Sequence, residues 1–424
     1  MVQQFTLNED NELRFDVVSE DVIIELCSGR AEVFGSELRQ REKYTFVPGM
    51  RVAVFSWTGA TVKVSGEAKN AYVAENNQPM TLYLNTHAAL EQLRSRATVD
   101  KTGKSRGPRV MVAGPMDVGK STVCRILANY AVRQGHAPIF VDVDVEQGNL
   151  SIPGTIAAVT VDRIADPVYG FDDRYAKVFQ FGSTSPATNI QLYNHLVDEL
   201  AALVKNECER CPELNKSGVI IDTCSWVKEA GYRSLVNAAE RFEVNLVVVL
   251  DQERLYTELK RDLRDTVKVV HHPKSGGVEA RPPSMRCANR TKSFHKYFYG
   301  TRQMSFNPYR IVISFDDLII AKIGTDRLPD SCMPHGMKPV DDGMMVVRIE
   351  PSVKLINHVV AITDGSVVDQ TLLNALAIGF VIIVDVSVES RQLSVTCPQP
   401  CFPEGTTVGL LSDVTFADDE IRVH

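Results

Sequence analysis

A run of nine residues, 114 to 122, has the residue types and the spacing needed to hold a chain of phosphates. It reads Gly-Pro-Met-Asp-Val-Gly-Lys-Ser-Thr and matches the pattern G-x-x-x-x-G-K-[ST]. Its glycines let the backbone curl so that successive N–H groups point inward. Lys120 should reach the β and γ phosphates of a nucleoside triphosphate, and the Ser121 hydroxyl should bind Mg²⁺. The motif predicts a nucleotide site made by Gly114, Asp117, Val118, Gly119, Lys120, Ser121 and Thr122.

The residues on either side agree with this interpretation. Arg109 to Ala113 form a short apolar run typical of a buried strand, and Val123 to Ala131 have the spacing of an amphipathic helix. The positive end of that helix would face the phosphates. A partial match, Gly103-Lys104-Ser105, has no strand before it and no glycine five residues earlier. We therefore place the nucleotide site at residues 114–122.

A magnesium site at such a loop also needs a carboxylate, which holds the ion through water. Asp142 and Asp144 follow one apolar run, and Asp222 ends another. Aspartates also occur at strand ends for purely structural reasons. The pattern alone therefore leaves open which of the three carboxylates serves the metal.

Residues 273–296 are strongly basic, although the whole chain has a formal net charge of −7. They include six lysines and arginines and one acidic residue. Pro283 is placed to open a helix. Arg286 and Arg290 would then share a face, with Arg281 in the segment before them. A solvated basic helix would give the same run, but arginines stay charged and fork onto phosphate oxygens. The stretch is a candidate lid, because phosphoryl transfer needs positive charge beside the migrating group.

Trp226 follows the end of an apolar run, where proteins with parallel sheets bind their ligands. It is one of two tryptophans in the chain. On the residues alone, a place in the core is the commoner role for such a side chain.

Apolar periodicity divides the chain into three regions. Residues 1–98 alternate polar and apolar side chains between glycines, which predicts a β-sandwich that ends in a helix over 86–98. Residues 99–309, which contain the lid, alternate short apolar strands with helices, as in a parallel sheet covered on both faces. Residues 310–424 return to short strands. We therefore predict an α/β fold in which a central P-loop domain lies between an N-terminal β-sandwich and a C-terminal β-rich domain.

The composition narrows the choice of partner and compartment. The 424 residues are 44% hydrophobic and 23% charged, which is typical of a globular protein of two or three domains. Because the net charge is negative, any nucleic-acid site must be a local basic patch. Cys208 and Cys211 have no second pair at zinc-finger distance, so we expect reduced cysteines in a cytosolic or nuclear protein. The N-terminus does not resemble a secretory signal, and the longest apolar run, 375–384, is too short for a membrane span, so we expect no membrane partner.

Many blocks of the sequence resemble one known family. Residues 114–121 resemble the G-P-T-D-V-G-K-[ST] loop of the polynucleotide 5′-hydroxyl kinase subunit of the eukaryotic pre-mRNA cleavage complex. Residues 142–148, with 151–155 behind them, are similar to that family's D-x-D-V-G-Q-x and S-x-P-G-T. Further blocks fit in the same order along nearly the whole chain, at 83–87, 181–189 (the substrate "clasp"), 223–227, 250–256, 273–278, 297–300 and 328–334.

The resemblance implies a three-domain kinase that transfers the γ-phosphoryl group of ATP to the 5′-hydroxyl of RNA. It implies ATP and Mg²⁺ as cofactors, and other subunits of the cleavage complex and the tRNA splicing endonuclease as partners. It also implies a place in the nucleus, in mRNA 3′-end processing and tRNA splicing.

The same resemblance assigns roles to individual residues. Asp144 becomes the favoured metal carboxylate together with Ser121, because Asp222 falls where the family has Asn. Trp226 is expected to stack on the first RNA base, a contact that tolerates any base. The remaining assignments are Lys120 on the phosphates, Gln147 near the metal and the attacking hydroxyl, Arg281, Arg286 and Arg290 in the lid, Glu12 and Arg51 on adenine, and Thr184 in the clasp on the substrate.

Three residues depart from the family pattern. Glu146 stands where the family has Gly, and it either opposes phosphate entry or points to solvent. Met116 and Ser225 replace a Thr and a Gly. Because some members of the family bind ATP without catalysis, the alternative function is a catalytically silent ATP-binding scaffold. A kinase of small metabolites is a third candidate, but it would not call for a tryptophan beside an arginine lid.

Overall fold

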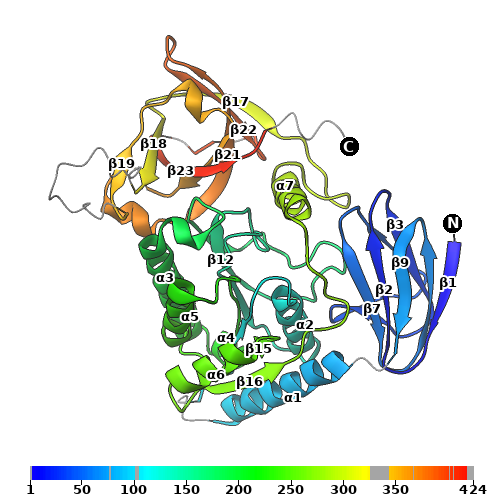
Figure 1. Ribbon diagram of the computed structural model, residues 1–424. Coiled ribbons are helices and arrows are strands. Elements are labelled where there is room, and N and C mark those ends of the chain that lie inside the picture. Colours follow the sequence, from blue (N-terminus) through cyan, green and yellow to red (C-terminus); the bar gives the residue numbers. More distant parts are fainter. Residues whose placement is uncertain are drawn as a thin grey trace. The chain divides into compact units, whose positions relative to one another are not determined.

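The computed structural model describes residues 2–75, 78–100, 105–324, 343–365, 367–400, 402–403 and 405–417. The chain divides into two compact units, which are described separately. The first contains Met1–Asp142, Ala158–Tyr175 and Leu203–Asn289, and the second contains Val143–Ala157, Ala176–Ala202 and Arg290–His424. Figure 1 follows the chain from the N-terminal strands in blue to the C-terminal strands in red.

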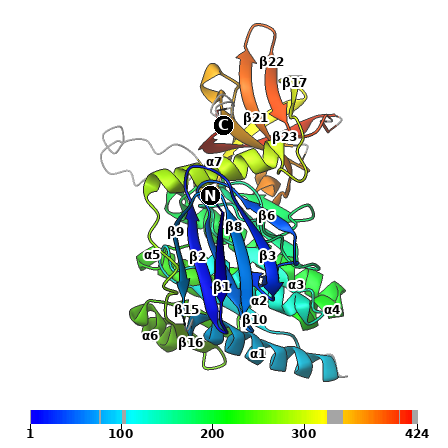
Figure 2. The same ribbon diagram turned by 90° about the vertical axis from the view of Figure 1, so that its right-hand side faces the viewer.

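The first unit begins with a β-sandwich, whose strands are labelled in Figure 2. One sheet has the order β1-β8-β3-β6 and the other β5-β4-β7-β2-β9, with antiparallel neighbours throughout. Alternate side chains of β3 and β8 are buried, as expected for strands with one face on a core. The strands are β1 (Val2–Leu7), β2 (Asn11–Val17), β3 (Val22–Gly29), β4 (Glu32–Val33), β5 (Ser36–Glu37), β6 (Lys43–Phe46), β7 (Arg51–Ser56), β8 (Ala60–Ser65) and β9 (Ala68–Ala74).

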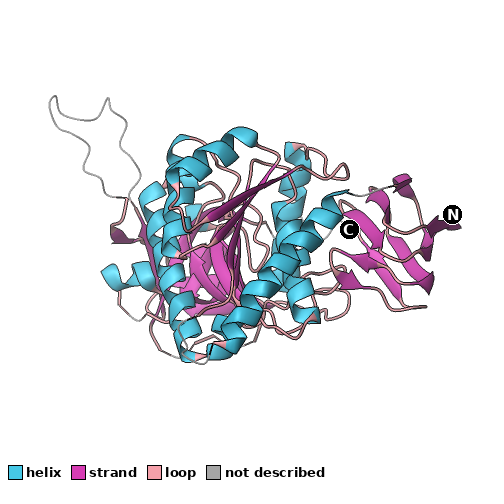
Figure 3. Cartoon of the chain, turned by 90° about the horizontal axis from the view of Figure 1, so that it is seen from below, coloured by secondary structure: helices cyan, strands magenta, loops and turns pink. Residues whose placement is uncertain are grey.

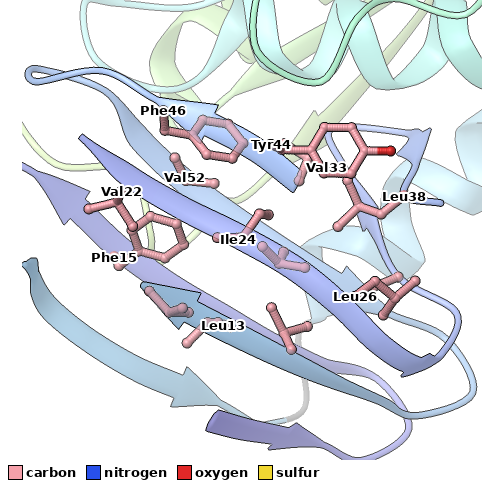
Figure 4. Close-up of a cluster of buried hydrophobic side chains, with 14 of the residues drawn as sticks. Leu13, Phe15, Val22, Ile24, Leu26, Val33, Leu38, Tyr44, Phe46 and Val52 are labelled. Carbon is pink, nitrogen blue, oxygen red and sulfur yellow. The ribbon is translucent and has the colours of Figure 1, made fainter. Parts of the chain in front are cut away.

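The inner faces of these two sheets share one apolar core. Figure 4 shows Leu13 and Phe15 of β2 near Val22 and Ile24 of β3, with Phe46 of β6 above them. The rings of Phe15 and Phe46 meet edge to face with centroids 6.3 Å apart. Each large apolar side chain buried in this way stabilises the fold by about 1.5–3 kcal/mol.

The first unit also contains five strands of the central sheet, in the order β11-β14-β10-β15-β16. These strands pair in parallel, and four of them are buried along their whole length. Figure 3 shows helices flanking the strands, which explains why the sequences of the four buried strands are largely apolar. The strands are β10 (Arg109–Ala113), β11 (Ile139–Asp142), β14 (Val219–Asp222), β15 (Leu246–Leu250) and β16 (Lys268–His272). The helices are α1 (Gln78–Val99), α2 (Lys120–Arg133), α4 (Pro212–Ser217), α5 (Glu229–Arg241) and α6 (Glu253–Asp262).

Three elements cross the boundary between the units: β12 (Thr155–Thr160), α3 (Ile190–Arg210) and α7 (Pro283–Tyr299). The second unit adds β13 (Lys177–Gln180), the short 3₁₀ helix η1 (Pro186–Thr188) and a C-terminal sheet with the order β17-β22-β21-β20-β23-β18-β19. The elements of the C-terminal region are β17 (Tyr309–Ser314), β18 (Leu318–Ile323), β19 (Val346–Arg348), η3 (Val353–Leu355), β20 (His358–Thr363), η4 (Gln370–Asn374), β21 (Ala377–Ser387), β22 (Gln392–Cys397) and β23 (Thr407–Thr415).

Aromatic contacts fix the second half of α7 to this C-terminal sheet. The ring of Phe294 stacks on Phe416 with centroids 5.0 Å apart, and Phe298 stacks on the same ring at 6.2 Å. The backbone N–H of Phe380 donates to the Tyr297 hydroxyl at 2.9 Å. The lid helix therefore ends in a rigid aromatic cluster.

The predicted fold class is confirmed: a β-sandwich precedes a parallel sheet with helices, and a β-rich region follows. The helix predicted to begin at Pro283 begins there. The helix predicted over 86–98 is longer, because α1 begins at Gln78. The block at 328–334, and Gly103 and Lys104 of the partial motif, lie outside the described residues. Among the described helices, none is long and apolar enough to cross a membrane.

Candidate phosphate-binding site

The loop at 114–122 joins the buried strand β10 to the first turn of α2. Gly119 lies immediately before α2 with φ of 92°, a left-handed conformation that favours glycine. A Cβ at Gly119 would lie 3.2 Å from Val278 Cγ2, and one at Gly114 would lie 2.9 Å from the Leu250 carbonyl oxygen. Both glycines are therefore needed for the close packing of this loop. The N-cap residue of α2 is Gly119, which has no side chain to cap the first turn, so the N–H groups there can serve an anion.

Lys120 is folded over its own loop. Its side chain is buried, with the residue 7% exposed, and its Nζ donates to the Pro115 carbonyl oxygen at 3.0 Å. Ser121 is exposed and Thr122 is partly exposed in the same turn. A buried ammonium held by one carbonyl can exchange that acceptor for phosphate oxygens at little cost in solvation. The loop therefore fits a triphosphate.

Asp117 joins the phosphate-binding loop to the predicted lid. It has φ of 57°, which Asp tolerates better than most residues. Its Oδ2 accepts a hydrogen bond from the Arg281 backbone N–H at 2.9 Å and forms an ion pair with the Arg286 guanidinium. Two of the three predicted lid arginines are thus held at the loop by one carboxylate.

Arg51 and Arg286 are both neighbours of Arg281. The pKa of Arg281 is lowered, first by loss of hydration and then by these two arginines, while Asp117 opposes the change. Arg51 Nη1 in turn donates to the Glu279 carbonyl oxygen at 2.8 Å. Arg51 also lies 3.5 Å from an Asp16 oxygen and 3.7 Å from a Glu279 oxygen, so a polyphosphate would compete with carboxylates for these arginines.

The predicted adenine residues Glu12 and Arg51 both lie on the sandwich strands beside the segment that leads into the lid. Glu12 is buried, with 6% exposure, and accepts a hydrogen bond from Arg14 Nε at 2.5 Å. Arg14 Nη2 donates to Ser275 Oγ at 3.4 Å. The role of Glu12 and Arg51 in adenine binding stays a prediction, and Arg14 is a neighbour that sequence reasoning missed.

Trp226 lies in the loop between β14 and α5 and is partly exposed. Its indole packs on Gly231, where an added Cβ would lie only 2.5 Å from the ring. Trp226 is therefore not a fully buried core residue, and its partly exposed ring is compatible with the predicted stacking role.

The remaining predicted site residues belong to the second unit. Asp144 is buried, and its Oδ1 accepts the Glu146 N–H at 3.0 Å. The Gln147 carbonyl oxygen accepts from Ser293 Oγ of α7 at 3.2 Å. Thr184 is partly exposed in the clasp, whose Gly182 carbonyl oxygen accepts from the Asp413 N–H at 2.8 Å. The segment around Asp144 and the clasp are thus each held by the second unit itself.

Glu146 does not face open solvent, and its expected effect on phosphate entry stays a prediction. Its carboxylate lies 3.6 Å from Arg290 Nη1, and the two side chains are 19% and 28% exposed respectively. Glu146 therefore neutralises the third lid arginine instead of facing open solvent.

A divalent metal would need ligands beyond the protein. Among the described residues, no group of three or more His, Cys, Asp or Glu side chains could hold a metal ion. Mg²⁺ commonly takes one or two protein oxygens, several waters and substrate phosphates. The Ser121 hydroxyl and the Asp144 carboxylate are hard oxygen ligands of the kind that this ion prefers.

Comparison with known proteins identifies the family. Three family models match the chain: "N-terminal beta-sandwich domain of polyadenylation factor" at 6–97, "mRNA cleavage and polyadenylation factor CLP1 P-loop" at 114–300, and "Pre-mRNA cleavage complex II protein Clp1" at 306–418. The chain is 51% identical over 423 residues to "Protein CLP1 homolog" of Brugia malayi, covering 99% of this chain and 97% of that one.

It is also 45% identical over 416 residues to the human protein named "Polyribonucleotide 5'-hydroxyl-kinase Clp1", covering 98% of this chain and 96% of the human one. A solved structure, "Structure of wild-type Clp1p-Pcf11p (454 -563) complex", has the same fold, with a TM-score of 0.83 at 21% identity and 98% of each chain covered. On the family models and these identities, the chain belongs to the Clp1 family.

Proposed function

We propose that the chain is an ATP-dependent polynucleotide kinase that transfers the γ-phosphoryl group to the 5′-hydroxyl end of RNA. The observation that carries the proposal is the contact of Asp117 with Arg281 and Arg286, which holds arginines against the phosphate-binding loop. Phosphoryl transfer depends on fixed positive charge beside the migrating group. The name of the human relative at 45% identity, a polyribonucleotide 5'-hydroxyl-kinase, supports the same reaction.

Each residue of the loop and lid then has a definite task. Lys120 leaves the Pro115 carbonyl and binds β and γ phosphate oxygens. Arg281 and Arg286 approach the transferred group from the lid, and Arg290 does so after leaving Glu146. When bound, Mg²⁺ would neutralise charge on the phosphates, with Ser121 and Asp144 as its protein ligands. Gln147 orients the attacking hydroxyl.

The RNA end is held by two parts of the chain. The Trp226 indole stacks on the first base, and Thr184 of the clasp contacts the backbone. Stacking contributes about 1–3 kcal/mol and does not read the identity of the base. The kinase is therefore expected to accept any first nucleotide.

The proposal includes a place in the cell. A structural neighbour is a Clp1p–Pcf11p complex, and a family model carries the name of the pre-mRNA cleavage complex. We infer that other subunits of that complex bind this chain in the nucleus, and that it also serves tRNA splicing together with the splicing endonuclease.

One experiment tests the reaction. Purified protein is incubated with γ-labelled ATP, Mg²⁺ and a short RNA that carries a 5′-hydroxyl, with Lys120→Ala as the matched control. The proposal expects label on the RNA with wild type and none with the variant. Absence of label in both, with ATP bound by the wild type, would refute it.

One observation favours a second candidate, a catalytically silent ATP-binding scaffold. Glu146 pairs with Arg290 and removes one of the three lid cations from the site. If ATP cannot displace this contact, the protein would bind nucleotide and partners without transferring phosphate. The same labelling experiment separates the two functions.

A further inference from the structure

The segment that leads into the lid, residues 273–282, has no helix or strand of its own. Its backbone must therefore be held by other parts of the first unit. Asp117 holds its end at Arg281, and Arg51 holds its middle at the carbonyl oxygens of Glu279 and Ala280, at 2.8 and 3.5 Å. A third contact lies at its beginning, where Arg14 meets Ser275.

Arg14 is unusually well fixed for a surface-strand arginine. It lies on β2, between β7 and β9, and its side chain is only 13% exposed. Strand periodicity puts Glu12 on the same face, and Tyr72 is the cross-strand partner. Nε donates to Glu12 at 2.5 Å, Nη1 to the Tyr72 hydroxyl at 3.3 Å and Nη2 to Ser275 Oγ at 3.4 Å. The planar guanidinium is thus held from two sides by residues of its own sheet, Glu12 and Tyr72.

The backbone of Gly276 and Gly277, in the segment 273–282, packs directly against this guanidinium. A Cβ at Gly277 would lie 2.8 Å from Arg14 Nε and 3.0 Å from its Cδ, and a Cβ at Gly276 would lie 3.2 Å from Nη1. Because real Cβ atoms essentially never come as close as 2.8 Å, a side chain at Gly277 would displace the guanidinium, whereas one at Gly276 would need it to shift only slightly. The contact of Gly276 and Gly277 with the Arg14 guanidinium therefore sets the distance between residues 273–282 and the sandwich strand β2.

We propose that Arg14 is a positioning residue for the lid: through Gly276 and Gly277 it sets where Arg281 and Arg286 stand at the phosphate-binding loop. The inference rests on the proposed kinase function for its consequence in catalysis, but the contact itself is a property of the nucleotide-free protein. Arg281 is only four residues beyond Gly277, so a shift at Gly277 is passed along a short extended chain.

The test is a double-mutant cycle of Arg14→Ala and Gly277→Ala. Arg14→Ala should lower kcat/KM for ATP about 10-fold, mainly through kcat, since one charge-assisted anchor is lost and the lid arginines leave their place. Gly277→Ala should lower kcat/KM for ATP by a similar factor when Arg14 is present. It should leave kcat/KM almost unchanged in the Arg14→Ala background, because the added methyl group then meets no guanidinium. Arg39→Ala is the control, since that arginine belongs to the same sandwich and is 85% exposed.

A second readout does not depend on transfer. Amide hydrogen exchange of residues 275–286 in the nucleotide-free protein should become at least 10-fold faster in Arg14→Ala than in wild type or Arg39→Ala. Equal exchange in all three proteins would overturn the proposal, even if no variant transfers phosphate. An equal loss of kcat/KM on Gly277→Ala in wild type and in Arg14→Ala would overturn the proposal as well.

Removal of Arg14 leaves Glu12 buried, so Arg14→Ala could fail to fold. In that case Arg14→Lys takes the place of Arg14→Ala and is combined with Gly277→Ala, because lysine keeps the charge and lacks the planar guanidinium. The proposal expects this pair to be more active than Gly277→Ala alone. If Arg39→Ala and wild type both fail to transfer phosphate, the proposed function fails, and the exchange measurement still decides the role of Arg14.

Discussion

Glu146→Gln should raise the activity of the kinase. The Glu146 carboxylate lies 3.6 Å from Arg290 Nη1, and phosphate must compete with it for that arginine. The change keeps the shape of the side chain and removes its charge. Arg290 then enters the site without first breaking an ion pair.

The magnitude follows from the distance and the exposure. Two unit charges 3.6 Å apart attract by roughly 5 kcal/mol at an effective dielectric constant near 20. Both side chains are partly exposed, so solvent screening and the ordering of the side chains leave about 1 kcal/mol. Because 1.4 kcal/mol corresponds to a factor of 10, we expect kcat/KM for ATP to rise about fivefold.

The assay is the initial rate of labelling of a 5′-hydroxyl RNA over a range of ATP concentrations, at low and at high salt. The gain should shrink at high salt, since the pair is partly exposed. Glu207→Gln is the matched control, because it removes the same charge from an exposed pair with Arg210 at 3.9 Å. An unchanged or lower kcat/KM in Glu146→Gln at low salt would refute the reasoning.

A second background separates the ion pair from simple repulsion of phosphate by Glu146. If the pair is the cause, Glu146→Gln should have no effect in a protein that already carries Arg290→Ala. If Glu146 acts on the phosphates directly, its removal should help equally in both backgrounds. The second result would assign the effect to repulsion and contradict the role given to the pair.

Three further predictions follow from the loop, the lid and the tryptophan. Saturating Mg-ATP should raise the melting temperature through mass-action linkage, by about 2.7 kcal/mol of stabilisation at 100 times the Kd, and a flat titration in calorimetry would contradict the nucleotide site. Lys120→Ala should abolish transfer, and Arg286→Ala should reduce it severely while both proteins keep their melting temperature; full activity in either would remove its assigned role. Trp226→Ala should lower kcat/KM for RNA about 10-fold for all four first bases alike, and a loss confined to one base would rule out stacking.

Local pattern was enough to predict the elements that carry the phosphate-binding loop. The run at 109–113 is β10, and Pro283 opens α7, because both depend on residues that are neighbours in the chain. The same holds for the order of strands and helices in the central region, where short apolar runs alternate with amphipathic stretches. The division into three domains stays a prediction.

The start of α1 was missed for a physical reason. The missed part of the helix, 78–85, buries only Met80 and Tyr83, which are too few to show a helical period. The inner face of the predicted part includes the polar residues Thr86, His87 and Arg94. Arg94 is completely buried and donates to the Ser217 carbonyl oxygen at 2.8 Å. Tertiary hydrogen bonds of this kind compensate for polar residues on an inner face, and no local periodicity reveals them.

The contacts that set the lid were also beyond local pattern. Asp117 and Arg281 are 164 residues apart, and Arg14 and Ser275 are 261 residues apart. The sequence showed the arginines as a basic run, but the carboxylates that hold them, Asp117 and Glu146, could be paired with them only in three dimensions. Sequence reasoning therefore predicted which groups carry charge and could not predict where each charge is held.

The most direct test of the central claim is a comparison of two RNAs that differ only at the 5′ end. One carries a 5′-hydroxyl and the other a 5′-phosphate, and each is incubated with this protein, Mg²⁺ and γ-labelled ATP. The account predicts label at the 5′ end of the hydroxyl RNA and none on the phosphorylated RNA. Binding of ATP without label on either RNA would contradict it, because the loop and lid would then hold nucleotide without performing transfer.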